Sequence, residues 1–252
     1  MYFISHFKIH DRIAMNINVF LLCYNEAFLI PHTVKHYKKY VPSCIITIYD
    51  NESTDNSVAI ATALGCNIVS WNSNNIHDED KQIYLRNNIW KNCRKGWIIM
   101  ADMDEFLCIT EEELLHESRR GVTILQIAGY DMIGESETID VTDIDLQQIK
   151  KYVDSPAEGK KLCFLREKIK EMFYGPGSHT CMPVGKIVYS SRTYINKHMC
   201  MLGLPFLKNK FIERYKRNEK MRQKGWNIHY TEDIIKIENM YLDTMNRSKL
   251  LT

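Results

Sequence analysis

The sequence lacks the features of a membrane-spanning, secreted or nucleic-acid-binding protein. Its formal net charge is only +2 over 252 residues, so no large basic surface points to nucleic acid. No stretch approaches the ~18–20 apolar residues that a bilayer span needs, and the N-terminal stretch lacks the unbroken apolar core of a signal peptide. Glycine and proline are also scarce, which we interpret as compositional drift. We therefore expect a soluble, cytoplasmic protein, with peripheral association with a membrane left open.

The eight cysteines show no CxxC spacing, and several lie in apolar, strand-like runs. This pattern favours buried thiols in a reducing compartment over a disulfide framework. The apolar fraction of 45% and the charged fraction of 25% are those of an ordinary globular protein with enough length for a real core.

The first half of the chain alternates strand and helix patterns. The apolar runs predict strands over 18–25, 44–50, 66–71 and 96–104, and the intervening segments predict helices over 27–41, 53–65 and 77–94. Strands that alternate with helices at this spacing predict an α/β fold, with a mostly parallel sheet covered by helices on both faces.

The second half is less regular. We expect a short helix over 111–118, a strand over 122–133, a polar excursion or lid over 140–154, and short strands around a glycine-rich turn within 161–191. Helical spacing resumes over 204–223, and 231–252 is predicted to be a peripheral helix. Residues 1–17 are expected to form an N-terminal arm.

Polar residues follow the strands of the first half in "CYNE", "YDNESTD" and "ADMDE". Open α/β sheets bind ligands at the carboxyl ends of their strands. In an extended segment residues i and i+2 point the same way, so Asp102 and Asp104 would aim two carboxylates at one point while Met103 faces away. Two such carboxylates repel without a cation, and oxygen donors suit Mg²⁺ or Mn²⁺. The triplet therefore predicts a divalent metal that bridges protein and substrate phosphates.

The stretch 18–106 resembles nucleotide-sugar-dependent glycosyltransferases of the GT-A fold, in the broad family 2 group. The resemblance rests on "LLCYNEAFLIPHTVKHY", "IYDNESTDNSVAIA" and "ADMDEF", and more weakly on "GYDM", "GPGSHTCMPVGKI", "NKHMCMLG" and "FIERYKRNEKMRQKGWNIHY". It implies a GT-A domain over 18–230, with a nucleotide-sugar-binding half at 18–110 and an acceptor-side half at 111–230. It also implies inverting transfer of a sugar from a nucleotide-diphosphate donor to a hydroxyl of a glycan, protein or small molecule.

The resemblance implies nucleotide contacts for the residues after the first two strands. Asn25 and Glu26 are expected at the nucleotide, and Asp50 or Asp55 near the base and ribose, with Asn51 in the same segment. An acidic residue beyond a strand can also hydrogen-bond ribose hydroxyls. The alternative is that these side chains cap the following helices or complement their dipoles.

Two basic residues on the third predicted helix, Lys81 and Arg86, are candidates to contact the donor diphosphate, although a solvated helix face explains them about as well. Asp102 is expected to contact the nucleotide sugar as well as the metal. The resemblance implies a late histidine as a further ligand, which makes the predicted metal set Asp102, Asp104 and His198.

Inversion needs a base on the acceptor side, and the candidates are Asp131 and His179, with Glu105 and Glu171 as further possibilities. Other interpretations stay open. The pairs His179/Cys181 and His198/Cys200 offer enough ligands for a tetrahedral zinc, although their spacing is shorter than usual. A non-catalytic sugar-nucleotide-binding protein is possible, as is a nucleotidyltransferase, although "CYNEAFL" lacks its phosphate loop.

Overall fold

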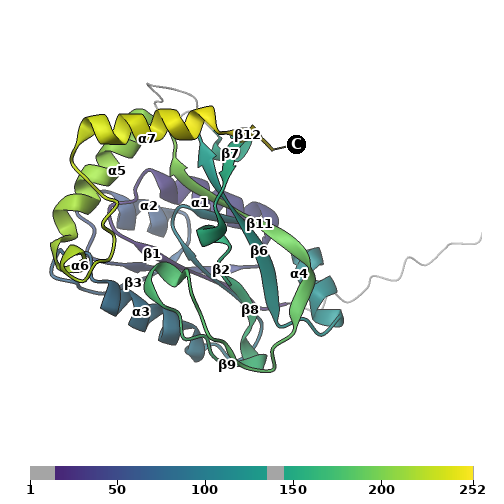
Figure 1. Ribbon diagram of the computed structural model, residues 1–252. Coiled ribbons are helices and arrows are strands. Elements are labelled where there is room, and N and C mark those ends of the chain that lie inside the picture. Colours follow the sequence, from purple (N-terminus) through teal and green to yellow (C-terminus); the bar gives the residue numbers. More distant parts are fainter. Residues whose placement is uncertain (1–14, 135–144, 252) are drawn as a thin grey trace, which may run out of the picture.

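The computed structural model describes residues 15–134 and 145–251, and it contains one large mixed sheet with helices on both faces (Figure 1). The strands follow the order β12-β7-β6-β8-β4-β1-β2-β3, and β11 pairs with both β5 and β6. The predicted fold class, an α/β sheet flanked by helices, is confirmed.

The first half forms the parallel part of this sheet. Its strands are β1 (Ile17–Cys23), β2 (Ile45–Asp50), β3 (Asn67–Ser70) and β4 (Trp97–Asp102), and their pairings with one another are all parallel. The helices are α1 (Leu29–Tyr40), α2 (Ser57–Ala63) and α3 (Glu79–Asn88), the last followed by the short 3₁₀ helix η1 (Ile89–Asn92). Each predicted element of this half is present, with shorter ends except at the start of β1, which begins one residue earlier than predicted, at Ile17.

The continuous apolar run of β1 is explained by burial on both sides. Val19 and Leu21 pack in the cluster that contains α1 and α2, whereas Phe20 packs in a second cluster with Trp90 on the opposite face. A strand covered on both faces has no solvent side, so it needs no alternation of polar residues.

The second half extends the sheet. Its strands are β5 (Glu105–Cys108), β6 (Ile124–Ile133), β7 (Lys151–Asp154), β8 (Cys163–Leu165) and β11 (Tyr189–Met201), and α4 (Glu111–Arg119) follows β5. The short antiparallel β8 lies between β4 and β6. A separate hairpin consists of β9 (Ile169–Glu171) and β10 (Val184–Gly185). Short 3₁₀ helices connect these elements: η3 (Leu146–Gln148), η4 (Pro156–Glu158), η5 (Arg166–Lys168) and η6 (Pro176–Ser178).

One prediction for this half is corrected. Residues 151–154 of the predicted polar excursion form β7, which pairs with β6, and residues 140–144 lie outside the described part. Strand β11 runs for 13 residues, and only 189–191 fall in the range where short strands were expected. It pairs with β5 on one side and β6 on the other.

The C-terminal elements are α5 (Leu204–Arg217), α6 (Glu219–Gln223), α7 (Ile234–Asn246) and β12 (Lys249–Leu250). The helix predicted over 204–223 is interrupted at Asn218. The predicted C-terminal helix is present as α7, whose Ile237 and Tyr241 pack with Phe211 of α5 in a third cluster, and the following β12 pairs with β7. Of the predicted N-terminal arm, residues 1–14 lie outside the described part and Ile17 begins β1. No described helix combines the length and the apolarity needed to cross a membrane.

Candidate active site

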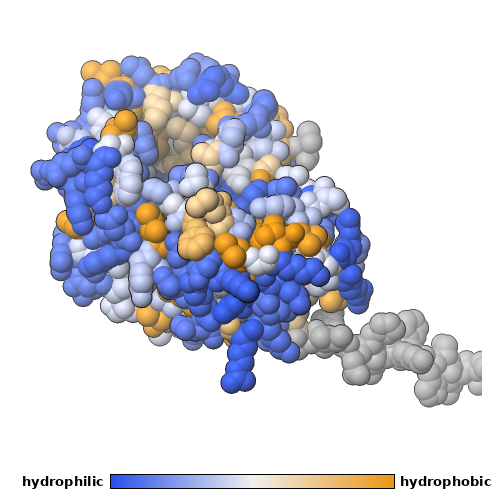
Figure 2. Space-filling view, turned by 60° about the horizontal axis from the view of Figure 1, so that its bottom comes forward, coloured by the Kyte–Doolittle hydropathy of each residue, from blue (hydrophilic) through white to orange (hydrophobic). Residues whose placement is uncertain are grey.

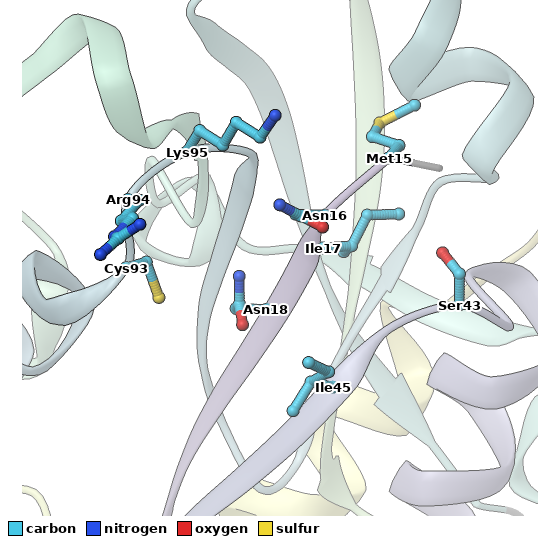
Figure 3. Close-up of a pocket in the computed structure, with 9 residues that line it drawn as sticks. All are labelled: Met15, Asn16, Ile17, Asn18, Ser43, Ile45, Cys93, Arg94 and Lys95. Carbon is cyan, nitrogen blue, oxygen red and sulfur yellow. The ribbon is translucent and has the colours of Figure 1, made fainter. Parts of the chain in front are cut away.

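A cleft of about 670 Å³ lies at the carboxyl ends of β1 and β4, and residues of α5 line it as well. The predicted site residues that line it are Asn25, Glu26, Asn51, Arg86, Asp102, Asp104, Asp131, His179 and His198. A smaller hollow of about 270 Å³ lies at the opposite edge of the sheet, between Asn16, Ile45 and Arg94, and no carboxylate lines it (Figure 3). The acidic residues therefore gather at the edge that the sequence predicts.

The turns after β1 and β2 are tied together by side chains. Asn25, whose backbone is in the left-handed region (φ 51°), accepts a hydrogen bond from the amide of Thr54 at 2.7 Å. The Asp55 carboxylate accepts from the amide of Ala27 at 3.2 Å and from that of Ser57 at 2.9 Å. These hydrogen bonds hold the turn after β1 against the turn after β2. Asp55 itself does not line the cleft.

Asp50 and Asn51 have partners within the protein. Asp50 is buried and accepts two hydrogen bonds from Ser53, at 3.0 Å from its amide and 2.6 Å from its hydroxyl. The side-chain amide of Asn51 donates through Nδ2 to Ser73 Oγ at 2.8 Å, and its Oδ1 accepts from the backbone N–H of Ser73 at 2.9 Å. Both residues thus hold the loops that follow β2 and β3, and of the two only Asn51 lines the cleft.

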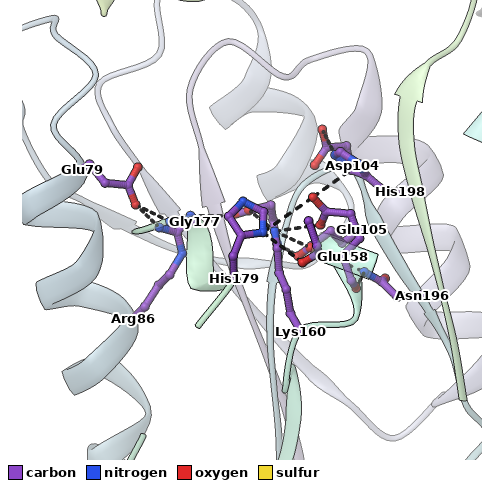
Figure 4. Close-up of polar contacts among 12 residues, drawn as sticks. Glu79, Arg86, Asp104, Glu105, Glu158, Lys160, Gly177, His179, Asn196 and His198 are labelled. Carbon is purple, nitrogen blue, oxygen red and sulfur yellow. Dashed lines mark hydrogen bonds and ion pairs between the residues drawn. The ribbon is translucent and has the colours of Figure 1, made fainter. Parts of the chain in front are cut away.

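Asp102, the last residue of β4, is held by two cations. Its Oδ1 accepts from the Arg86 guanidinium at 2.7 Å, and its Oδ2 lies 3.5 Å from Lys160 Nζ. Arg86 is buried and is also bound by Glu79 at 3.2 Å, so its position on α3 is fixed (Figure 4). Lys81 points elsewhere and donates to the carbonyl of Asn72. Of the two basic candidates on this helix, the structure brings only Arg86 into the cleft.

Lys160 was not predicted from the sequence, yet it is the centre of the acidic cluster. Its buried ammonium lies 2.8 Å from Glu105 Oε1 and 2.9 Å from Glu158 Oε2, in addition to Asp102 (Figure 4). Burial raises the pKa of Glu105 to about 7, and the neighbouring Asp102 and Glu158 charges add to the effect while Lys160 opposes it. The Lys160 ammonium therefore contacts three carboxylates, of which Asp102 also pairs with Arg86.

The extended conformation predicted for Asp102–Asp104 is wrong, because β4 ends at Asp102 and Met103 and Asp104 form the turn into β5. Asp104 Oδ2 accepts from Lys210 Nζ of α5 at 2.6 Å and lies 3.3 Å from His198 Nε2. Burial alone would raise the pKa of the Asp104 carboxyl, but Lys210 and His198 hold it well below its usual range. The two aspartates thus have different cationic partners in this structure.

The imidazole of His198 lies between two carboxylates. Asp131 Oδ1 is 2.7 Å from Nδ1, and Asp104 Oδ2 is near Nε2. Burial would lower the pKa of His198, but Cys200, Asp104 and Asp131 raise it well above its ordinary value. A carboxylate on Nδ1 orients the ring and directs Nε2 to Asp104, which is how metal-binding histidines are commonly held.

The predicted metal ligands are of the chemical types that a divalent cation prefers. Asp102 and Asp104 offer carboxylate oxygens, and His198 offers a nitrogen. Within the described residues, one group of at least three potential ligands lies within 4.8 Å, namely Asp131, His198 and Cys200. Of the predicted metal ligands only His198 belongs to this group, and Asp102 and Asp104 do not. The zinc alternative needs His179 and Cys181 to join His198 and Cys200, and neither of the first two belongs to it.

The candidate bases differ in access to the cleft. Glu105 is 1% exposed, and Glu171 is paired with Lys91 at 2.6 Å and does not line the cleft. Asp131 is engaged with His198. His179 is exposed, and its Nδ1 lies 3.0 Å from the carbonyl of Ala157. Because a carbonyl only accepts, Nδ1 carries the hydrogen and Nε2 is left as the basic nitrogen.

Helix α5 contributes basic residues that the sequence reasoning missed. Lys210, Arg214 and Arg217 are four and three residues apart, and all three line the cleft. Arg214 donates to the hydroxyl of Tyr230 at 2.6 Å, and the Arg217 guanidinium lies 3.2 Å from the centre of the Tyr24 ring. The i, i+4, i+7 spacing of these residues places three positive charges on one face of the helix, a pattern in the sequence that predicts a binding surface for an anion.

No protein-family model matches this chain. It is 33% identical over 57 residues to Protein RfbJ of Shigella flexneri, a match that spans 23% of this chain and 44% of that protein. The chain thus covers less than half the length of this curated relative.

Solved structures to which the chain is similar include S. aureus TarS residues 1–349 in complex with UDP-GlcNAc, with 11% identity, a TM-score of 0.46, and coverage of 92% of this chain and 72% of that one. Another is glucosyl-3-phosphoglycerate synthase from Mycobacterium tuberculosis with Mn²⁺ and UDP-glucose, with 18% identity, a TM-score of 0.30, and coverage of 46% and 44%. At these identities and scores, function has to be argued from the site of this chain itself.

Proposed function

We propose that this protein is a glycosyltransferase of the GT-A type, which transfers a sugar from a nucleoside-diphosphate donor to an acceptor hydroxyl with inversion. The observation that carries the proposal is the charge arrangement of the cleft. Asp102 and Asp104 stand beside the cations Arg86, Lys160 and Lys210 within a single cavity at the carboxyl edge of the sheet. A diphosphate needs cations, and a divalent metal that accompanies it needs carboxylates.

The parts of the donor are assigned to different walls of the cleft. The nucleotide would lie along the turns after β1 and β2, at Asn25, Glu26 and Asn51, while Asp50 and Asp55 support those turns. The diphosphate would lie between Arg86 of α3 and the basic face of α5. The sugar would then point towards β6 and β11.

The residues that would hold Mn²⁺ or Mg²⁺ are Asp102, Asp104 and His198, with Asp131 orienting the imidazole. The bound ion would act as a Lewis acid that neutralises charge on the leaving diphosphate. Lys210 and Arg214 would supply further positive charge to the same group, in a cleft where such charges act strongly.

His179 is the base that the geometry favours. Its Nε2 would take the proton of the acceptor hydroxyl as the hydroxyl oxygen bonds to the anomeric carbon, and the bond from that carbon to the diphosphate oxygen breaks. The nucleoside diphosphate leaves with the electron pair of that bond. Asp131, the other predicted base, is assigned a positioning role because its carboxylate is already bonded to His198.

The proposal is tested in two steps with the full chain. A thermal-shift screen of UDP-, GDP-, CDP- and dTDP-sugars with Mn²⁺ identifies the donor, because ligands of the folded state raise its stability. Release of nucleoside diphosphate from that donor is then measured for the wild type, Asp104→Asn and Glu171→Gln.

We expect a loss of about 100-fold or more for Asp104→Asn, with an unchanged circular dichroism spectrum. The matched control Glu171→Gln removes a carboxylate outside the cleft and should turn over like the wild type. Donor binding without any turnover by the wild type would instead identify a non-catalytic sugar-nucleotide-binding protein. Full activity of Asp104→Asn would contradict the assigned metal site.

A further inference from the structure

The β9–β10 hairpin and the segment that leads from it into β11 carry an exposed apolar surface, which we call the hairpin patch. It consists of five large apolar side chains that are each at least 36% exposed, namely Phe173, Met182, Val184, Val188 and Tyr189. Phe173 and Met182 are 51% and 72% exposed. Figure 2 shows this face of the molecule, with hydrophobic residues near its centre and hydrophilic residues around and below them.

The outward position of Phe173 is imposed by its neighbours. Met172 and Tyr174 on either side are buried, and both backbone groups of Tyr174 are bonded to the side chain of Asn87, at 2.8 and 3.0 Å. The backbone of Phe173 is in the left-handed region (φ 48°), which is costly for an aromatic residue. The fold thus holds an aromatic ring in solvent in an unfavourable backbone conformation.

The charges around the hairpin patch are mainly basic. Lys170 lies in β9, Lys168 directly precedes β9 and Lys186 directly follows β10, and all three are exposed. The acidic residues of this segment are engaged elsewhere: Glu171 pairs with Lys91 at 2.6 Å, and Glu167 accepts from the amide of Gly96 at 2.9 Å. Exposed apolar side chains with exposed lysines around them match the surface of an anionic bilayer.

A second exposed apolar surface has a different charge pattern. Ile235 and Leu242 on α7 are 69% and 56% exposed. The exposed charges beside them are of both signs: Glu232, Asp233 and Asp243 are acidic, Lys236 and Arg247 are basic, and Arg247 pairs with Asp243 at 2.9 Å. This surface lacks the basic excess of the hairpin patch, so charge distinguishes the two surfaces.

We propose that the hairpin patch binds the surface of an anionic lipid bilayer. The loop between Phe173 and Met182 connects this surface to the active site, because Gly177 and His179 of that loop line the cleft. The protein would therefore bind peripherally, with the acceptor side of its cleft beside the headgroups. This inference concerns binding alone and stands or falls independently of the transferase proposal.

The test is sedimentation of the full chain with vesicles of phosphatidylcholine, and with vesicles of an equal mixture of phosphatidylcholine and phosphatidylglycerol. We expect binding to the mixed vesicles that weakens in high salt, and little binding to phosphatidylcholine alone. The triple variant Lys168→Gln, Lys170→Gln, Lys186→Gln should bind on the order of 100-fold more weakly, since each lysine near an anionic surface contributes about fivefold.

The apolar contribution is tested with Phe173→Ser combined with Met182→Ser. We expect this variant to keep about a tenth of the wild-type affinity for the mixed vesicles, or less. The matched control is Ile235→Ser combined with Leu242→Ser on α7, which should bind like the wild type. Melting temperatures of all variants verify that they are folded.

Three outcomes would overturn the inference. The first is equal binding to both kinds of vesicle. The second is an equal loss of binding in the α7 control. The third is a wild-type dimer in gel filtration that the Phe173→Ser, Met182→Ser variant converts to a monomer, because the patch would then be an interface between copies of this chain.

Discussion

The buried ammonium of Lys160 offers a quantitative test of how the acidic cluster is held together. Lys160→Met removes the charge and keeps most of the side-chain volume. It leaves Glu105 and Glu158 without their common partner, and Asp102 with Arg86 alone. Breaking a buried ion pair by removing one partner costs about 3–5 kcal/mol. We expect a loss in this range at pH 8, a large part of the stability of an ordinary domain.

The loss should depend on pH in a defined direction. The pKa of Glu105 is already raised to about 7 by burial in the wild type, and removal of Lys160 raises it further. The folded variant then keeps a proton that the unfolded chain has released. Its stability is therefore greatest below the ordinary carboxyl pKa and falls as the pH rises through the raised pKa, by up to about 1.4 kcal/mol per pH unit for each such proton.

The assay is urea unfolding between pH 6 and pH 8, followed by tryptophan fluorescence in buffer with a chelator. Lys161→Met is the matched control, since Lys161 is half-buried and bonded only to Gln126 among the described side-chain acceptors; it should lose less than about 1.5 kcal/mol. Adding Glu105→Gln to Lys160→Met should recover about 1–3 kcal/mol. A loss for Lys160→Met below about 1 kcal/mol, or one that does not change with pH, would refute the reasoning.

Three further predictions concern separate features. Thr110→Ala removes the capping box of α4 and should cost about 1 kcal/mol in thermal unfolding; no change in melting temperature would contradict the cap. Asp131→Asn should lower the affinity for Mn²⁺ about 10–100-fold in calorimetry, because the ring of His198 loses its orienting carboxylate; an unchanged affinity would return Asp131 to the candidate bases. Lys210→Gln should bind Mn²⁺ more tightly than the wild type in the absence of donor, since the lysine no longer occupies Asp104, and a weaker affinity would speak against this competition.

The parallel half of the fold was predictable because its signals are local. Continuous apolar strands such as β1 and amphipathic helices such as α1 appear in the sequence as runs and periods, and these determined both the sheet and its ligand edge. The edge then predicted where Asp102 and Asp104 lie, although not that Asp104 is in a turn. A strand end depends on its pairing partners, which a single sequence does not show.

The acceptor-side residues were less predictable, because their partners come from distant parts of the chain. Lys160 belongs to a polar segment before β8, and only the pairing of β8 between β4 and β6 brings it to Glu105. Asp131 and His198 were both candidates, but their direct bond follows from the register of β6 against β11. That bond changes their roles, since an aspartate that orients a histidine cannot also serve as a free base.

The contacts of Asp104 imply how metal and donor binding are coupled. Its Oδ2 is bonded to Lys210, and the same carboxylate would hold a divalent ion. A metal that enters alone would displace a partly buried ammonium from its one ion-pair partner among the described residues, and would bring no anion to replace it, which is unfavourable. A metal that enters with a diphosphate brings that anion, so Lys210 could move from the carboxylate to the phosphate without losing its charge partner. The Lys210–Asp104 ion pair between α5 and the β4–β5 turn therefore favours joint binding of metal and donor. Helix α5 is the element whose lysine changes its partner.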